Sequence, residues 1–150
     1  MSRKTPSVEL LREALNQLEA GIGWLERSYN QCASIGLKDH YTPDEYDRYE
    51  NLSSRYARVA DLIVQKVLRS IDTVELVEPG SLLDTANRAV ARGLVDSVET
   101  LRAFKDLRND IAHEYKTDDL AELFSDVLLA TPELLRLARS ILQYGNSLLD

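Results

Sequence analysis

The chain has 150 residues and a formal net charge of −7, from 25 acidic and 18 basic side chains. This length corresponds to one domain and is enough for a substantial apolar core. The hydrophobic share of 44% and charged share of 29% are ordinary for a soluble globular protein and argue against extended disorder. The acidic balance argues against a protein that coats nucleic acid with Lys and Arg. A small basic site remains compatible with it, because exposed charges are screened beyond about 10 Å at about 0.1 M salt.

Nothing in the sequence predicts a membrane segment or an exported protein. No apolar run approaches the ~20 residues of a membrane-crossing helix. The opening stretch MSRKTPSVEL has basic residues but no apolar segment after them, so we expect no signal peptide. A single cysteine, Cys32, fits a reducing cytoplasm, and its place on an apolar helical stripe predicts a buried residue without reactivity. We therefore expect one cytoplasmic domain over residues 1–150, with residues 1–6 flexible.

The first predicted helix is long and amphipathic. Its apolar residues alternate spacings of three and four, as on one face of a bundle helix: Val8, Leu11, Leu15, Leu18, Ile22, Leu25, Tyr29 and Cys32. Gly36 and the polar KDHY end the segment. Gly21 and Gly23 weaken the middle of the helix, and we expect them to allow close packing of a neighbour.

The tetrapeptide TPDE predicts the start of a second helix, with Thr42 as N-cap, Pro43 at the first position and Glu45 completing a capping box. The apolar face then continues toward Ile71 through Tyr49, Leu52, Tyr56, Val59, Ile63, Val67 and Leu68. We expect its tyrosines to pack in the core and grooves with their hydroxyls at the rim. A platform for stacking bases is the weaker alternative, because such platforms usually carry interleaved basic residues.

Three further helical segments complete the chain. Ser81 starts a short helix that Gly93 stops. Asp96 with Glu99 begins another, whose inner face comprises Val98, Leu101, Phe104, Leu107 and Ile111. Thr117 caps a last helical region, which Thr131-Pro132 breaks or kinks into two pieces. No segment alternates with a period of two, so the predicted fold class is all-α, an antiparallel bundle of four to five helices.

The stretch LRNDIAHEY, residues 107–115, gathers four chemically capable side chains: Arg108, Asn109, His113 and Tyr115. Spacings of four, three and four place another set on one polar stripe of an ideal helix: Arg102, Asp106, Asn109 and His113. Arg108 and His113 lie five positions apart and would point about 140° apart on a straight helix. They would converge only if the helix ended near Ile111, or if a second copy contributed across a dimer.

Three interpretations of this cluster are open. A metal site is disfavoured, because His113 has no second histidine beside it and zinc sites need several N or S ligands. An ordinary structural role is favoured by spacing alone: His113 near a helix C-terminus interacts well with the helix dipole, and Arg108 can pair with Asp106, Asp110 or Glu114. A catalytic role suits the residue types, because phosphodiester cleavage needs a proton-transfer group active near neutral pH and a fixed guanidinium for the charged phosphate. Asn109 would orient the imidazole or bond a phosphate oxygen.

The octet RNDIAHEY resembles the R-x4-H-x-Y signature of the HEPN superfamily, in the form carried by HepT toxins of HepT/MntA toxin–antitoxin pairs. Arg108, Asn109, His113 and Tyr115 all stand where that pattern has them. Residues 81–115 also resemble the short helix, glycine turn and motif helix of the family. The resemblance covers residues 8–145, and the motif is far more specific than the remainder.

The resemblance implies a helical homodimer in which the motifs of two subunits face each other across a cleft. It implies an endoribonuclease that needs no metal and no cofactor, with His113 as general acid/base and Arg108 as the phosphate-binding group. It also implies a partner, a minimal nucleotidyltransferase antitoxin that silences the toxin by transferring AMP to Tyr115. Bulky phosphate groups at that position would block the cleft and repel RNA. Which RNA is cut is not indicated.

The same resemblance leaves a second function open, because relatives of this fold have been read as non-catalytic modules that bind a nucleotidyltransferase. Three cations of the second helix also have two interpretations. Arg55, Arg58 and Lys66 either add positive charge to the cleft or form salt bridges on a solvated face.

Overall fold

The protein is described here by a computed structural model that covers residues 6–78, 80–113 and 120–149. Its elements are α1 (Pro6–Ile35), α2 (Pro43–Asp61), a π-helical segment η1 (Leu62–Val67), α3 (Leu68–Val74), α4 (Leu82–Ala91), α5 (Val98–His113) and α6 (Leu120–Ser147). No strand occurs in these residues, which confirms the all-α class. The expected flexibility of residues 1–5, the cap at Thr117 and the position of Tyr115 lie outside the described residues, whereas Pro6 is already the first residue of α1.

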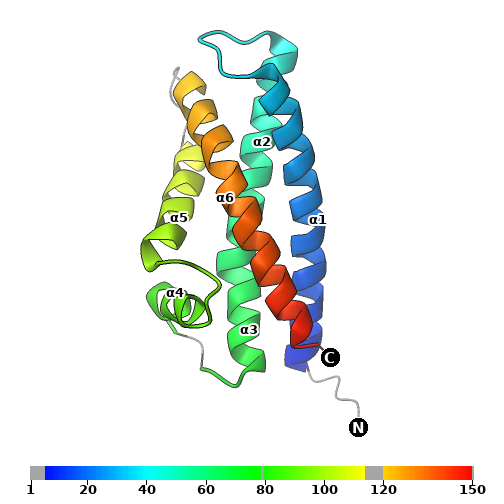
Figure 1. The fold of residues 1–150 in the computed structure, drawn as a ribbon, viewed down its shortest axis with the longest axis vertical. Coiled ribbons are helices and arrows are strands. Elements are labelled where there is room, and N and C mark those ends of the chain that lie inside the picture. The colour runs from blue at the N-terminus through cyan, green and yellow to red at the C-terminus, as the bar shows by residue number, and fades with distance from the viewer. Residues whose placement is uncertain (1–5, 79, 114–119, 150) are drawn as a thin grey trace.

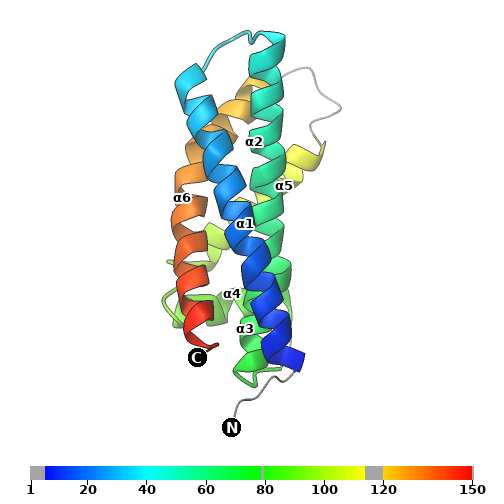
Figure 2. The ribbon, with the colours of Figure 1, turned by 90° about the vertical axis from the view of Figure 1, so that its right-hand side faces the viewer.

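The helices form an antiparallel bundle. Because α2, η1 and α3 follow one another without interruption, the described chain has five rods, four long and one short. Figure 1 shows α1, the α2–α3 rod, α5 and α6 along the long axis in alternating directions, with α4 lying across the lower end. In Figure 2, α1 and α2 stand side by side in front of α5. Helix α2 packs against α1, α5 and α6, which confirms the predicted bundle of four to five helices.

The predicted apolar stripes form the core. On α1 the fully or almost fully buried members include Leu11, Leu15, Leu18, Ile22, Leu25 and Cys32. Burial raises the pKa of the Cys32 thiol to about 11, which agrees with the expected inert role.

An aromatic cluster lies between α2 and α6, and it corrects the expectation that the tyrosine hydroxyls lie at the rim. The Tyr49 ring stacks on Phe124 at a centroid distance of 5.0 Å, and the Tyr49 hydroxyl donates to the Gly36 carbonyl at 2.6 Å. Tyr56 is also fully buried, and its hydroxyl has no hydrogen-bond partner in the described part of the chain. Burial raises the pKa of Tyr56 well above its usual range. Both hydroxyls therefore lie inside the protein and not at the rim.

The helix ends follow the turn chemistry of the sequence, with one correction. The capping box at Thr42 and Glu45 is present, and Gly93 ends the short helix α4 with a φ of +76° that only glycine adopts easily. Helix α5, however, begins at Val98, because the Ser97 hydroxyl accepts a hydrogen bond from the Thr100 backbone N–H. A serine hydroxyl next to the helix supplies the cap that Asp96 was expected to give.

Helix α6 is not broken into two pieces at Pro132, so the predicted break is wrong, whereas the kink named as its alternative stays a prediction. Pro132 lies inside a single helix that runs from Leu120 to Ser147, on an exposed position. Proline lacks the backbone N–H that would donate to the Leu128 carbonyl, four residues earlier, so the helix gives up one hydrogen bond at this turn. The Thr131 hydroxyl donates to the Val127 carbonyl at 2.6 Å.

Gly21 confirms one of the two expected close approaches. A Cβ atom at Gly21 would lie 3.2 Å from Cγ2 of Val59, so α1 and α2 come close at this point. A Cβ atom at Gly23 would meet nothing within 4 Å. Only Gly21 therefore serves the contact between the two helices.

The π-helical segment η1 was not predicted. The Leu68 backbone N–H donates to the carbonyl of Ile63, five residues earlier, so this turn holds an extra residue. Val59, Ile63 and Val67 are buried and spaced by four, a spacing that drifts by about 40° per step on an ideal α-helix. The wide turn compensates for that drift and keeps all three side chains in the core.

A buried carboxylate fixes α4 to the end of the long rod. Asp72 on α3 is 1% exposed and accepts hydrogen bonds from Arg88 at 3.1 Å and from Arg92 at 2.7 Å. Arg88 lies on α4 and Arg92 directly after it. Two guanidinium groups on one carboxylate offset the cost of burying its charge, and together they set the position of the crossing helix.

We expect Asp72→Ala to lower the free energy of unfolding by about 2 kcal/mol, because Arg88 loses its carboxylate partner at a partly buried site, while Arg92 retains its ion pair with Glu75. The matched control is Asp96→Ala, which removes an exposed carboxylate whose one ion pair among the described residues is with Arg136 at 3.5 Å, and it should change stability by less than about 0.5 kcal/mol. Urea denaturation monitored by circular dichroism measures both values. Equal effects of the two variants would contradict an anchoring role for Asp72.

Candidate functional site

Helix α5 presents the motif at its exposed edge. Its inner residues Leu101 and Phe104 are buried, while Leu107 and Ile111 are half-buried. The helix packs against α2, α4 and α6 through this face. His113, the last residue of α5, is exposed to solvent. The amphipathic pattern therefore fixes the helix and leaves its polar stripe accessible.

Arg108 makes an ion pair with Asp61, the last residue of α2. Its Nε atom donates to Oδ1 at 2.9 Å and to Oδ2 at 3.1 Å, and both side chains are about a third exposed, at 35% and 36%. This corrects the predicted pairing with Asp106 or Asp110, each of which lies two positions from Arg108 and projects in another direction. The third predicted partner, Glu114, is outside the described residues. An ion pair this exposed contributes little to stability, so its main effect is to orient the guanidinium.

The two motif residues Arg108 and His113 do not meet within one chain. Helix α5 continues to His113, which removes the possibility that it ends near Ile111. The two side chains therefore project about 140° apart. A site that uses both groups on one ligand requires a second copy of the chain.

Arg108 lies between two hollows of different character. On one side, a hollow of about 220 Å³ between α2, α5 and α6 is mainly apolar and includes Tyr46, Phe124 and Ser53 in its wall. The Ser53 hydroxyl is buried and has no hydrogen-bond partner among the described residues. On the other side, a hollow of about 500 Å³ has polar walls, with Asp61, Arg69, Lys105, Arg108 and Asn109 from the rod and α5.

Of the other residues predicted for the site, Asn109 lies beside Arg108 in the polar hollow. Arg55 and Lys66 do not reach it. Arg55 donates to Ser28 on α1 at 2.6 Å and sits over the Trp24 ring at 5.0 Å, and Lys66 donates to Gln17 on α1 at 3.2 Å.

The salt-bridge interpretation of the second-helix cations therefore does not hold for Arg55 and Lys66, whereas a contribution to a cleft between two subunits stays a prediction. Both face α1, and their partners among the described residues are neutral side chains and the Trp24 carbonyl. Arg58 is exposed and lines neither hollow beside Arg108.

Sequence reasoning missed three charged residues of the site. Lys105 had a usable signal, since it precedes Arg108 by three positions and shares that side of α5. Asp61 and Arg69 belong to a distant segment, 47 and 39 positions from Arg108 in sequence, so no local pattern connects them.

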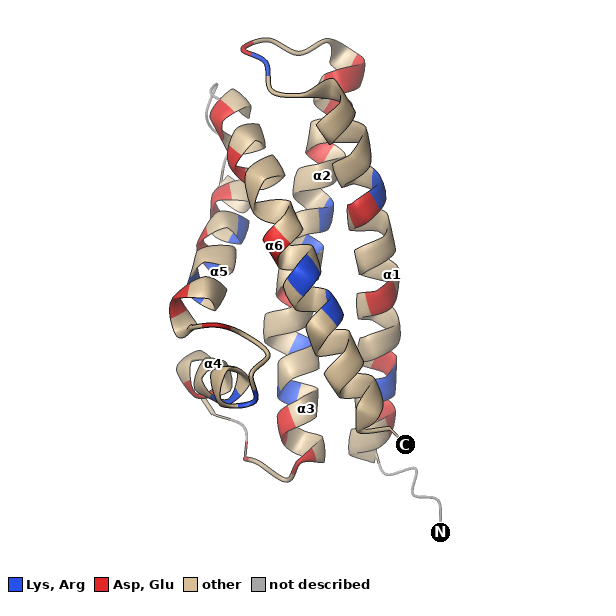
Figure 3. Ribbon diagram, viewed as in Figure 1, with Lys and Arg blue, Asp and Glu red and all other residues tan. Residues whose placement is uncertain are grey.

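The charge distribution gives no single charged face at the level of whole helices. Figure 3 shows acidic and basic residues interspersed along α1, α5 and α6.

Within the described ranges, no group of three or more His, Cys, Asp and Glu residues is arranged to hold a metal ion. None of the helices in the described part of the chain is both long enough and apolar enough to cross a bilayer.

Comparison with protein-family models, with curated proteins and with solved structures finds no match to the chain. The resemblance to the HEPN superfamily accordingly rests on the motif residues and their helical context in this chain alone.

Proposed function

We propose that the protein is a HepT-like endoribonuclease toxin that acts in the cytoplasm as a homodimer and needs no metal. One observation carries the proposal: the sequence contains the complete R-x4-H-x-Y octet, and its part from Arg108 to His113 forms the exposed end of α5 in a helical bundle. The open polar hollow beside Arg108 supports it further.

The chemistry follows from the side chains. The 2′-hydroxyl of the substrate attacks the adjacent phosphorus, the bond from phosphorus to the 5′-oxygen breaks, and a 2′,3′-cyclic phosphate and a 5′-hydroxyl result. The 2′-hydroxyl proton passes to an imidazole, and the leaving oxygen receives a proton, which is the acid/base role of His113. The guanidinium of Arg108 stabilises the additional negative charge on the pentacoordinate phosphate.

A dimer is needed for this mechanism because of the geometry of α5. Twofold symmetry places the same helix from both chains on either side of one axis, so Arg108 of one protomer and His113 of its partner approach a shared ligand. The dimer then contains two such Arg108–His113 pairs, and each protomer supplies one residue to each pair.

A second candidate function is a non-catalytic module that binds a nucleotidyltransferase. The Arg108–Asp61 pair favours it, because a guanidinium already neutralised by a carboxylate has less charge to offer a phosphate. The two functions differ in whether the isolated protein cleaves RNA.

We expect His113→Ala to lower the rate of RNA cleavage by at least about 100-fold, since it removes the proton-transfer group. The assay incubates the purified protein with total RNA in the presence of a chelator. His40→Ala is the matched control, because His40 is the other histidine of the chain, is exposed in the loop before α2, and should leave the rate unchanged. Equal cleavage by wild type and His113→Ala, or no cleavage by unmodified wild type on any RNA, refutes the ribonuclease and leaves the binding module.

We expect subunit complementation between Arg108→Ala and His113→Ala. Each homodimer lacks one required group, whereas the heterodimer retains one Arg108–His113 pair that spans the interface and should recover about half of the wild-type rate. The heterodimer is isolated with two different affinity tags, and tagged homodimers of each variant serve as controls. A heterodimer as inactive as the homodimers would show that no site is shared between protomers.

We expect AMP to be attached to Tyr115 by the nucleotidyltransferase partner. Its hydroxyl oxygen attacks the α-phosphorus of a nucleoside triphosphate, and pyrophosphate leaves. Intact-mass measurement after co-expression with a nucleotidyltransferase encoded beside the protein should show AMP-sized increments that Tyr115→Phe abolishes. Tyr41→Phe, a half-buried tyrosine of the α1–α2 connection, is the control. Increments that persist in Tyr115→Phe would place the modification elsewhere.

A further inference from the structure

We infer that Arg69 and Lys105 bind backbone phosphates of single-stranded RNA next to the linkage held by Arg108. They lie in a groove between α3, α4 and α5, called here the basic groove. The inference rests on the proposed function, because it assigns the path of the RNA away from the reacting phosphate.

The basic groove consists of two adjoining hollows. The polar hollow of about 500 Å³ beside Arg108 shares Leu82, Lys105 and Asn109 with a second hollow of about 370 Å³ between α4 and α5. Together their walls contain four cationic and two anionic side chains: Arg69, Arg102, Lys105, Arg108, Asp61 and Asp106. The groove thus has an excess of positive charge in a chain whose net charge is −7. Such a local excess favours a polyanion at short range, while the rest of the surface disfavours non-specific contact.

Three of these cations are uncommitted. Arg69, Arg102 and Lys105 are exposed and make no ion pair with any described residue, whereas Arg108 is paired with Asp61. Of the three, Arg69 and Lys105 line the hollow beside Arg108. Uncommitted surface cations lose no existing partner when they contact a phosphate, so binding there is not offset by a broken ion pair.

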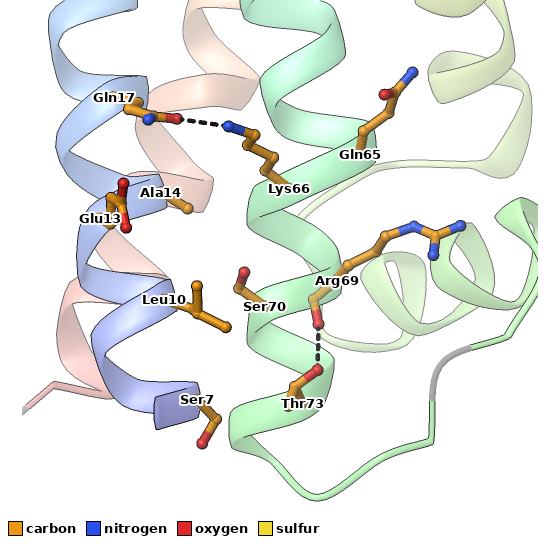
Figure 4. A pocket seen from close by; sticks show the side chains of 10 residues that line it. All are labelled: Ser7, Leu10, Glu13, Ala14, Gln17, Gln65, Lys66, Arg69, Ser70 and Thr73. Carbon is orange, nitrogen blue, oxygen red and sulfur yellow. Dashed lines mark hydrogen bonds between the residues drawn. The ribbon is translucent and has the colours of Figure 1, made fainter. Parts of the chain in front are cut away.

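The side-chain direction of Arg69 agrees with this assignment. Figure 4 shows another hollow, between α1 and α3, where Lys66 points to Gln17. Arg69 and Gln65 in the same view extend away from α1. Both residues also line the polar hollow of the basic groove. The guanidinium of Arg69 therefore points to the side of α3 that faces α4 and α5, away from α1.

The π turn brings Arg69 to this side. Asp61 and Arg69 are eight positions apart and would be separated by about 80° around an ideal α-helix. Each residue of a π turn rotates the chain by less, because its hydrogen bond spans five residues. Asp61, Gln65 and Arg69 consequently line the same hollow, and Arg69 stands in line with the Asp61–Arg108 pair.

A nucleic acid strand fits this arrangement better than a compact anion does. Lys105 precedes Arg108 by three positions, about 4.5 Å along α5, and Arg69 faces them from α3. A strand offers one phosphate after another, so successive cations each find a partner. Asn109, between the two hollows, offers an amide that can donate to a phosphate oxygen or a ribose hydroxyl.

The test measures binding of a fluorescently labelled single-stranded RNA by anisotropy over a range of KCl concentrations. All proteins are full-length and contain His113→Ala, so that the RNA stays intact. The groove variant is Arg69→Gln with Lys105→Gln. The control is Arg27→Gln with Arg58→Gln, which removes the same charge from two exposed positions outside the basic groove.

We expect the groove variant to bind about tenfold more weakly near 0.1 M salt, and the slope of log affinity against log salt to become shallower by about 1.4, or about 0.7 for each lost phosphate contact. The control should keep the slope of the parent protein. Equal losses in both variants would mean that only net charge matters, and no loss in either would mean that RNA does not enter the groove. A poly-glutamate peptide that competes as well as unlabelled RNA would indicate a docking surface for an acidic protein instead. Each of these three results overturns the inference.

Failure of the inference and failure of the ribonuclease are separable. If wild type cleaves RNA but the groove variant binds RNA like the control, the basic groove is refuted as the RNA path and the ribonuclease proposal stands. If only the groove variant loses binding and wild type does not cleave RNA, the basic groove stands as the RNA path and the ribonuclease proposal is refuted.

Discussion

Arg108 and His113 are separated by five positions on one unbroken helix, and this separation governs what the candidate site can do. A helix cannot be bent enough to bring such positions together without losing its backbone hydrogen bonds. Packing of Leu101 and Phe104 fixes that helix against the bundle, so its outer stripe has one fixed orientation. The two residues therefore face different sides of α5 within one protomer, and their joint action in a dimer belongs to the proposed function.

The net charge of the protein does not show which of its cations already have partners and which are free to bind an anion. Asp72 occupies Arg88 and Arg92 in holding α4, and Arg55 is occupied by Ser28 and the Trp24 ring. These cations have structural partners, although their positions in the sequence look no different from those of the others. What remains uncommitted beside Arg108 is a small set on α3 and α5. Net charge thus describes solubility and long-range repulsion, while local pairing decides where an anion can bind.

Much of the fold could be predicted because it depends on local chemistry. Periodicity located the long helices, and the capping residues Thr42, Ser81 and Gly93 located several of their ends. The failures have physical reasons that are not local. Pro132 lies inside one continuous helix that is packed on the rest of the bundle, and the hydroxyls of Tyr49 and Tyr56 are buried because of what packs around them. At the site, the motif was evident in the sequence, whereas the partner of Arg108 comes from another helix and depends on tertiary packing.

The wide turn at Leu62–Val67 has a consequence for how such a chain can vary. A π turn is what an α-helix becomes when one residue is inserted and the flanking turns are kept. Loss of one residue there would restore regular winding and leave the turns before and after it in their present relative orientation. Asp61 and Arg69 would then be seven positions apart, about 20° from alignment on an ideal α-helix, and would still line one wall of the same hollow. Related chains that lack this one residue would keep the motif of α5, the bundle and the charges that face the motif.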